Sequence, residues 1–268
     1  MKILIIGAGN MGTTFGASFL RSSIITSENL YFMDHLPEKA AGIKELSAHP
    51  LAVTPDAWVS DMDLIILGVK PQDFGNLAGS LKAYMRPDQL LLSIMAGISI
   101  GEIKGRLGTP KVMRAMPNLP AQLGRGMTVF TTSDEVTRIE SYTVQNLLNT
   151  TGKTIFTEDE NQINAATAVS GSGPAYVFYF MNAMIEAARE MGFSQAEAQL
   201  LVSQTFEGAL DLVNRGSLSC DEWIKRVSSR GGTTEAAIRS FDSAVVRESI
   251  KQGLEAARLR AIQLSESQ

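Results

Sequence analysis

The chain contains a glycine-rich hexapeptide with the spacing that binds the phosphates of a dinucleotide. Residues 7–12, GAGNMG, match G-x-G-x-x-G; they follow the apolar run KILII and precede a helical pattern. In this fingerprint Gly7 allows a tight turn, Gly9 lets the backbone approach a pyrophosphate, and Gly12 lets helix and strand pack closely. The pyrophosphate lies at the helix N-terminus, where free N–H groups and the helix dipole favour an anion. The pattern predicts nucleotide binding; a tight turn that binds no ligand is the alternative.

A carboxylate at the end of the second predicted strand bears on the choice of coenzyme. Asp34 lies 22 residues after Gly12, close to the spacing of a ribose-binding carboxylate. Such a group accepts a hydrogen bond from the ribose 2′-OH and repels a 2′-phosphate, which favours NADH over NADPH. His35 and Lys39 are close in sequence and could receive a phosphate, and a solvated aspartate without a ligand is a further alternative. The sequence therefore favours NADH only slightly.

Two further segments follow apolar strands, where ligands bind in open α/β sheets. They are residues 68–71, GVKP, and residues 95–97, MAG. Such loops lie at the carboxyl edge of the sheet. Small residues and proline also occur in any short connection, so each segment alone is equally consistent with a plain loop.

The candidate bases argue against alcohol oxidation, which needs a proton donor or acceptor at oxygen. The two histidines, His35 and His49, both lie in the nucleotide-binding half, and we expect both at the surface. A lysine-dependent hydroxyacid dehydrogenase would carry G-x-G-x-x-x-K-x-x-x-N at the start of its second domain. Residues 171–173 supply the glycines of that pattern, but Val177 and Met181 occupy the lysine and asparagine positions.

Reduction of an imine places different demands on a site. A protonated C=N bond is already electrophilic, so the protein must chiefly align it with a hydride donor and hold any substrate carboxylate. Residues 228–235, SSRGGTTE, place two glycines before threonines that open a helix. Backbone N–H groups at such a helix start bind carboxylates. An ordinary helix cap with a flexible lead-in is the alternative.

These segments need a scaffold of alternating strands and helices. We predict strands over residues 2–6, 30–33, 51–53, 64–69, 90–94, 111–114, 127–131 and 153–156. The runs 64–69 and 90–94 are almost uniformly apolar, as in parallel strands buried on both faces. The succession predicts an α/β fold, with an N-terminal Rossmann-type doubly wound sheet as the dinucleotide-binding domain over residues 1–157.

From residue 158 onward the sequence predicts only helices. Ser194 with Glu197, and Ser219 with Glu222, form capping-box patterns, and apolar residues recur at helical spacing. We expect residues 158–268 to form an all-helical C-terminal domain for substrate binding and dimerisation, with apolar faces packed against a second copy. The alternative is that this helical domain packs only against the N-terminal domain of the same chain.

Composition excludes several other classes of protein. Lys and Arg number 24 against 28 Asp and Glu, a net charge of −4, and no basic run of five is present, which argues against nucleic-acid binding. No apolar run approaches the roughly 20 residues of a membrane span. The single cysteine, Cys220, excludes an internal disulfide and a cysteine-based zinc cluster. We expect a soluble, cytoplasmic protein with a small-molecule substrate and no metal, membrane or nucleic-acid partner.

Six segments, in order along the chain, resemble the pyrroline-5-carboxylate reductase family. They are IGAGNMG (6–12), GVKPQ (68–72), MAGIS (95–99), RAMPNLPA (114–121), AVSGSGPAY (168–176) and SSRGGTTEAAI (228–238). SGSGPAY together with GGTT is specific, whereas the glycine fingerprint is shared widely. The resemblance implies reduction of 1-pyrroline-5-carboxylate to L-proline, the last step of proline biosynthesis, by NADPH or NADH. It also implies a homodimer through C-terminal helices, with dimers often assembling into a decamer.

The resemblance implies roles residue by residue. The implied coenzyme contacts are Gly7, Ala8, Gly9, Asn10, Met11, Gly12, Gly68, Val69, Lys70, Pro71, Ile94, Met95 and Ala96. Gly232, Thr233 and Thr234 would hold the substrate carboxylate through backbone N–H groups, with the Thr234 hydroxyl near the ring nitrogen as the catalytic group. Glu160 matches an acidic residue of the family's substrate site; a charge in the first turn of a helix is the alternative.

Three positions depart from the family pattern. Leu119 replaces a threonine, Arg226 an asparagine and Arg230 a proline; they bear on coenzyme preference and rate rather than on reaction type. A 3-hydroxyacid or 6-phosphogluconate-type NAD(P)-dependent dehydrogenase is the alternative enzyme, disfavoured by Val177. A regulator that binds NAD(P) without turnover is the second alternative.

Overall fold

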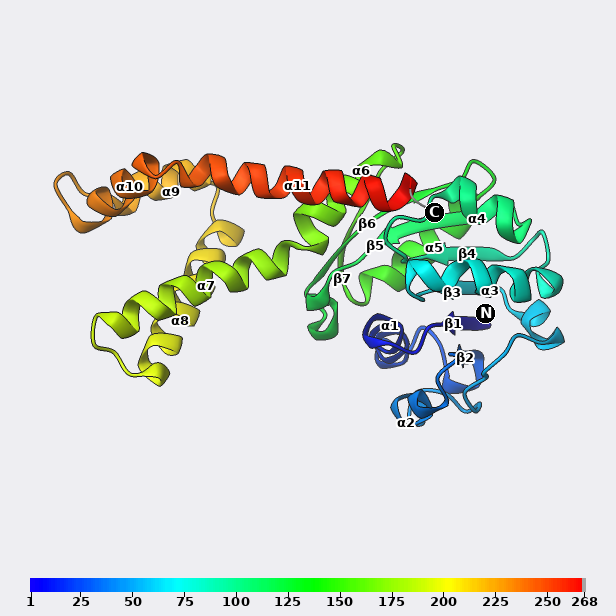
Figure 1. The fold of residues 1–268 in the computed structure, drawn as a ribbon. Helices are drawn as coiled ribbons and strands as arrows, with labels where there is room; N and C mark the ends of the chain where they lie inside the picture. Colours follow the sequence, from blue (N-terminus) through cyan, green and yellow to red (C-terminus); the bar gives the residue numbers. More distant parts are fainter. Residues whose placement is uncertain (267–268) are drawn as a thin grey trace. The chain divides into compact units, whose positions relative to one another are not determined.

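The computed structural model of the protein describes residues 1–266 and divides into two compact units (Figure 1). Of the described residues, the first unit contains Met1–Pro174 and residues 257–266, and the second contains Ala175–Ala256. The predicted boundary after residue 157 divides the chain by secondary structure and stays a prediction. Within residues 1–266, no helix combines the length and the apolar character that crossing a bilayer requires.

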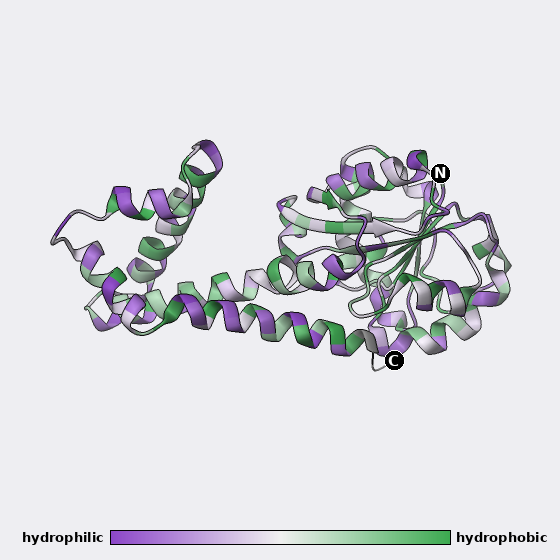
Figure 2. Cartoon of the chain, turned by 90° about the horizontal axis from the view of Figure 1, so that it is seen from above, coloured by the Kyte–Doolittle hydropathy of each residue, from purple (hydrophilic) through white to green (hydrophobic). Residues whose placement is uncertain are grey.

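The first unit is built on a seven-stranded sheet with the order β2-β1-β3-β4-β5-β6-β7. The strands are β1 Ile3–Ile6, β2 Leu30–Met33, β3 Leu64–Leu67, β4 Leu90–Ser93, β5 Val112–Met116, β6 Gly126–Thr132 and β7 Gly152–Phe156. The first five pair in parallel, and Ile3 lies opposite Leu30 on one side and Leu64 on the other. The β6 strand pairs with β5 in the antiparallel sense. The strands are largely hydrophobic because helices cover both faces (Figure 2).

Helices pack on both faces of this sheet, which confirms the predicted doubly wound α/β fold. They are α1 Asn10–Arg21, α2 Ala40–Ile43, α3 Phe74–Leu81, α4 Ile100–Leu107, α5 Arg138–Asn149 and α6 Asn161–Ala166. Ile3 and Ile5 of β1 belong to a core cluster with side chains of α1 and α5. Leu4 and Ile6 belong to a second cluster with α3 and α4. Successive residues of one strand thus anchor opposite layers.

The predicted strand over residues 51–53 is wrong. The structure contains only an isolated bridge between Ala52 and Met33 at this position. Pro50 and Pro55 flank the segment closely, and a proline offers no N–H to a ladder. The segment is therefore too short to pair beyond one residue, and β2 ends the sheet on this side.

The second unit is helical, as the sequence predicts. Its helices are α7 Gly173–Glu190, α8 Gln195–Arg215, α9 Cys220–Val227, α10 Thr233–Ser243 and the first half of α11 Val246–Glu266. Both predicted capping boxes are confirmed, at the starts of α8 and α9. Hydrogen bonds from Ser194 and Ser219 hold the pKa values of Glu197 and Glu222 below the ordinary glutamate value. No residue of α7 is buried.

Candidate functional site

The glycine loop between β1 and α1 has two glycines that packing requires and one that it does not. Gly7 has φ +108°, and a Cβ there would lie 2.6 Å from the Gly68 carbonyl oxygen. A Cβ on Gly12 would lie 2.0 Å from the Gly7 oxygen, whereas a Cβ on Gly9 would meet no protein atom within 4 Å. Gly9 therefore borders open space at the point where the fingerprint predicts close approach of a pyrophosphate.

The N-terminus of α1 has the properties of an anion site. Gly9 is its N-cap, no side chain caps it, and its first turn holds no acidic residue. The bond from the Thr13 N–H to the Gly9 oxygen (3.0 Å) closes the first turn. The preceding N–H groups of Asn10, Met11 and Gly12 thus lie at the positive end of a twelve-residue helix. With the space beside Gly9, this end fits a dinucleotide pyrophosphate.

Asp34 lies at the carboxyl end of β2 and is buried, with 9% of its surface exposed. Its Oδ2 accepts a hydrogen bond from the Ala8 N–H (2.8 Å), and its Oδ1 accepts one from the Leu36 N–H (3.0 Å). His35 Nδ1 lies 3.5 Å from Oδ1. The carboxylate thus ties the glycine loop to the end of β2, a link that sequence spacing alone does not predict. Each carboxylate oxygen has a second lone pair for a ribose hydroxyl.

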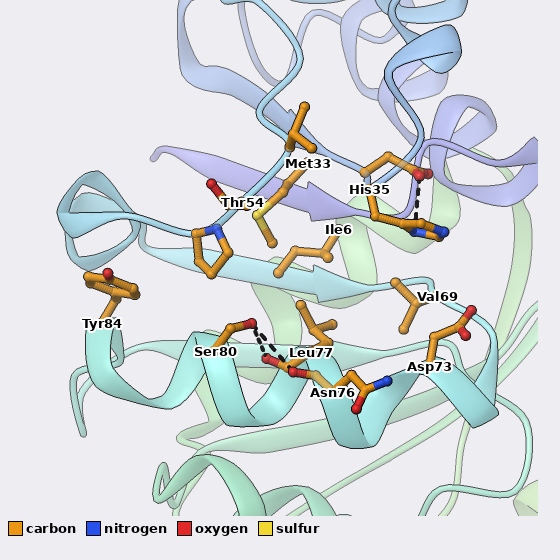
Figure 3. A pocket seen from close by; sticks show the side chains of 13 residues that line it. Ile6, Met33, His35, Thr54, Val69, Asp73, Asn76, Leu77, Ser80 and Tyr84 are labelled. Carbon is orange, nitrogen blue, oxygen red and sulfur yellow. Dashed lines mark hydrogen bonds and ion pairs between the residues drawn. The ribbon is translucent and has the colours of Figure 1, made fainter.

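A cavity of about 570 Å³ opens beside Asp34 at the carboxyl ends of β1, β2 and β3 (Figure 3). This is the place where the chain order of the parallel strands reverses, the usual ligand site of open α/β sheets. Its size is typical of small-molecule sites. The side chains that line it are Ile6, Met33, Asp34, His35, Val53, Thr54, Pro55, Val69, Asp73, Asn76, Leu77, Ser80 and Tyr84.

Sequence reasoning missed most of that lining. Thr54 follows the bridge at Ala52, and Asn76, Ser80 and Tyr84 belong to α3 and the turn after it. Figure 3 shows Asn76 and Ser80 along α3, on the side of the cavity opposite Met33. Residues three to four positions apart lie on the same face of a helix, and Asn76 and Ser80 have this spacing on α3. That spacing is the sequence signal that could have identified them.

The other predicted coenzyme residues follow β3, which is next to β1 in the sheet, and β4, which is next to β3. The Gly68 N–H donates to the Ile6 oxygen (2.8 Å), and a Cβ on Gly68 would lie 3.3 Å from Ile94 Cδ1. Lys70 is exposed and precedes a 3-10 turn at Pro71–Asp73, and Met95 is buried. The predicted coenzyme positions after β1, β2, β3 and β4 are thus brought to one edge of the sheet; their contacts with a coenzyme stay predictions.

Glu160 lies just before α6 in the first unit, where its carboxylate links three elements. Its Oε1 accepts hydrogen bonds from the Ile100 N–H (2.8 Å) and from Nη1 of Arg114 (2.9 Å). The side chain of Arg114 is buried and that of Glu160 is one-third exposed. Glu160 therefore has a structural role in addition to the substrate contact that the resemblance implies, which stays a prediction.

Gly232, Thr233 and Thr234 lie in the second unit, at the start of α10. Gly231 has φ +72°, which favours glycine, and a Cβ on Gly232 would lie 3.0 Å from the Ser229 carbonyl oxygen, so the space at Gly232 is tight. No side chain caps the helix at Gly232. The Gly232 N–H donates to the Ser229 oxygen (3.0 Å), and the bond from Ala236 to the Gly232 oxygen closes the first turn. The N–H groups of Thr233, Thr234 and Glu235 are the donors that this arrangement leaves at the helix start.

Glu235 adds a negative charge to the same turn. Its Oε2 accepts a hydrogen bond from the Gly231 N–H, and its Oε1 accepts one from Arg239 (2.8 Å). The Gly231 bond, and then the charge of Arg239, hold the pKa of Glu235 below the ordinary glutamate value. Of the positions that depart from the family pattern, Arg226 stacks on the Trp223 ring at 5.6 Å, and Leu119 and Arg230 are exposed.

The fold and the sheet-edge site define a Rossmann-type oxidoreductase that binds a nicotinamide dinucleotide and carries a helical C-terminal region. Two family models match its two parts: "NADP oxidoreductase coenzyme F420-dependent" over residues 2–97 and "Pyrroline-5-carboxylate reductase dimerisation" over residues 160–264. The chain belongs to the pyrroline-5-carboxylate reductase family.

Full-length relatives establish that membership. The chain is 36% identical to the pyrroline-5-carboxylate reductase of Pseudomonas aeruginosa, covering 99% of this chain and 97% of the relative. It is 32% identical to pyrroline-5-carboxylate reductase 2 of Bacillus subtilis, covering 99% and 95%. The crystal structure of the Plasmodium falciparum pyrroline carboxylate reductase with NADP bound matches with a TM-score of 0.87 at 26% identity, covering 99% and 98%. These matches do not favour the alternative of a 3-hydroxyacid or 6-phosphogluconate-type dehydrogenase.

Proposed function

We propose that this protein reduces 1-pyrroline-5-carboxylate to L-proline, the last step of proline biosynthesis. The names of its full-length relatives support this substrate. The observation that carries the proposal is the start of α10, where a two-glycine turn with Gly231 at φ +72° leads into a helix without a side-chain cap. Such a helix start is suited to a carboxylate, the one anionic group of this substrate.

The residues of this chain bind and orient the substrate. The reaction adds a hydride to the ring carbon and a proton to the ring nitrogen; NAD(P)H, when bound, supplies the hydride. The N–H groups of Thr233 and Thr234 hold the carboxylate, and the Thr234 hydroxyl holds the ring nitrogen as the catalytic group. Gly232 provides the space and conformation of the turn, because its own N–H is bonded to Ser229; its predicted substrate contact stays open.

For the coenzyme we infer a preference for NADH. The pyrophosphate binds at the N-terminus of α1, and the predicted contacts in residues 68–71 and 94–96 share its sheet edge. Asp34 supports NADH because a buried carboxylate held by two backbone N–H groups stays in place beside the cavity. A fixed negative charge there disfavours a 2′-phosphate.

The second unit supports a homodimer. The eighteen residues of α7 contain none that is buried, and Phe178 and Tyr179 are 59% and 76% exposed. Apolar surface of this extent marks an interaction site, and a second copy is the partner that the dimerisation model supports. Assembly of dimers into a decamer is part of the same proposal. The exposed free thiol of Cys220 is suited to a reducing compartment, and we assign the protein to the cytoplasm.

Purified protein tests the proposal by oxidation of NADH and NADPH in the presence of pyrroline-5-carboxylate. Thr234→Ala should lower kcat/KM by roughly one to three orders of magnitude, with little change in coenzyme affinity, because it removes a hydrogen bond used mainly in the transition state. Thr233→Ala is the matched control: it keeps the backbone N–H and should leave kcat/KM nearly unchanged. Absence of turnover, or unchanged kinetics of Thr234→Ala, would contradict the proposal.

A further inference from the structure

His35 lies beside the buried carboxylate at the end of β2 and faces the same cavity. Its Nδ1 lies 3.5 Å from Asp34 Oδ1, and 68% of the His35 side chain is exposed. Both residues line the cavity of about 570 Å³ at the carboxyl ends of β1, β2 and β3. Figure 3 shows the imidazole next to the carboxylate, at the edge of this cavity. The two side chains therefore form a pair that a ligand in the cavity can reach.

The carboxylate of this pair is fixed, whereas the imidazole has an unused nitrogen. Asp34 accepts the N–H groups of Ala8 (2.8 Å) and Leu36 (3.0 Å). Nδ1 of His35 faces this carboxylate, and within residues 1–266 Nε2 makes no hydrogen bond in the structure. A neutral imidazole has one N–H donor, and a protonated one has two. Protonation therefore leaves the Nε2–H as a free donor, and it balances the negative charge of Asp34.

The other titratable groups around the cavity are carboxylates, lysines and a tyrosine. Among the described residues, the titratable side chains of the lining are Asp34, His35, Asp73 and Tyr84. Charged side chains that follow β2 or β3 in the chain, outside the lining, are Glu38, Lys39 and Lys70. The glycine loop, residues 7–12, has no titratable side chain. Of these side-chain types, only histidine ordinarily changes its charge between about pH 5 and 8.

We propose that His35 is a specificity-determining residue, which lets the cavity accept NADPH in addition to NADH as the pH falls. The inference rests on the proposed function and its coenzyme site. Beside a neutral imidazole, the fixed carboxylate of Asp34 repels a 2′-phosphate. Beside a protonated one this charge is balanced, and the Nε2–H of His35 donates a charge-assisted hydrogen bond to the phosphate. NADH has no 2′-phosphate, so its binding depends far less on this proton.

The phosphate of NADPH titrates in the same pH range, which decides the choice of variants. A phosphate monoester takes up its second proton at about pH 6. Its repulsion from Asp34 therefore falls at low pH even when no histidine is present. The response that belongs to His35 is the part that disappears when the histidine is replaced.

Binding of the two coenzymes to the full-length protein, without substrate, tests the inference. Coenzyme fluorescence gives the Kd of NADH and of NADPH between about pH 8 and about pH 5.5. In the wild-type protein, the ratio of the NADH Kd to the NADPH Kd should rise roughly ten- to thirtyfold as the pH falls over this range. His35→Asn should reduce that rise to about threefold or less, the part due to the phosphate.

Two further variants check the charge and the position of the histidine. His35→Arg is positively charged at every pH, so its ratio at about pH 8 should already reach the wild-type ratio at about pH 5.5. His49→Gln is the matched control, because His49 is the other histidine of the chain and does not line the cavity. Its ring stacks on Tyr31 of β2 at 4.0 Å, and its replacement should leave the pH response unchanged.

Four results would overturn the inference: no pH response in the wild-type protein, a full response in folded His35→Asn, an equal loss of response in His49→Gln, or an unchanged ratio in His35→Arg at about pH 8. A protein that binds both coenzymes but does not turn over pyrroline-5-carboxylate would instead remove the proposed reaction and leave the role of His35 standing. Tighter binding of NADPH than of NADH at about pH 8 would remove the NADH preference, and the pH response would still decide the role of His35.

Discussion

Replacing Asp34 with asparagine separates its structural bond from its effect on the coenzyme. The carboxylate accepts N–H groups from Ala8 (2.8 Å) and Leu36 (3.0 Å) and is almost fully buried. Asparagine has one oxygen and one NH₂ group, so in either orientation one backbone N–H faces a donor. The lost charge-assisted hydrogen bond should lower the free energy of unfolding by about 1.5–3 kcal/mol.

The same substitution should shift the enzyme toward NADPH. A carboxylate and a phosphate charge about 6 Å apart repel by roughly 3 kcal/mol per unit charge at an effective dielectric constant of about 20, and solvent at the cavity mouth reduces this. A remaining difference of about 1.5–3 kcal/mol corresponds to a roughly ten- to hundredfold rise in the ratio of kcat/KM for NADPH to that for NADH. Part of that change comes from weaker NADH use, because asparagine lacks the second acceptor.

The assay compares initial rates with both coenzymes at saturating pyrroline-5-carboxylate, together with thermal unfolding of the same preparations. Asp73→Asn is the control, because Asp73 lines the same cavity but belongs to the turn before α3; its coenzyme ratio should not change. An unchanged ratio in folded Asp34→Asn, or an equal shift in Asp73→Asn, would refute the reasoning and leave Asp34 as a clamp on the glycine loop alone.

Two other predictions concern the glycine loop and the helical unit. Gly9→Ala places a Cβ in open space, so thermal unfolding should be unchanged while KM for the coenzyme rises about tenfold or more. Gly12→Ala places a Cβ 2.0 Å from the Gly7 oxygen and should cost about 1–3 kcal/mol of stability as well; equal behaviour of the two variants would show that no ligand lies at Gly9. Tyr179→Glu, on the exposed face of α7, should convert the dimer to monomers on a sizing column with light scattering. Ile139→Glu, at an 80% exposed position of α5, should not.

The limits of sequence-based prediction are clear at the start of α10. The motif SSRGGTTE predicts three backbone donors for a carboxylate, yet the Gly232 N–H is taken by the Ser229 oxygen and the Gly231 N–H by Glu235. Whether an N–H group is free depends on the dihedral angles of the turn, which glycine leaves unrestricted. Composition therefore identifies the loop but not its donors.

The sequence alone determined the seven strands as segments, the glycine loop and the helical capping boxes, because each depends on residues that are close together in the chain. The largely apolar runs of β3 and β4 are buried on both faces, and a Cβ on Gly7 or Gly12 would collide with backbone atoms. The tertiary structure alone decided which distant side chains meet. Arg114 and Glu160 are 46 residues apart, and Glu160 and Ile100 are 60 apart. Thr54 and Ser80 line one cavity only because β2, β1 and β3 are adjacent. Such pairings depend on how whole elements pack, and no local pattern of residues encodes them.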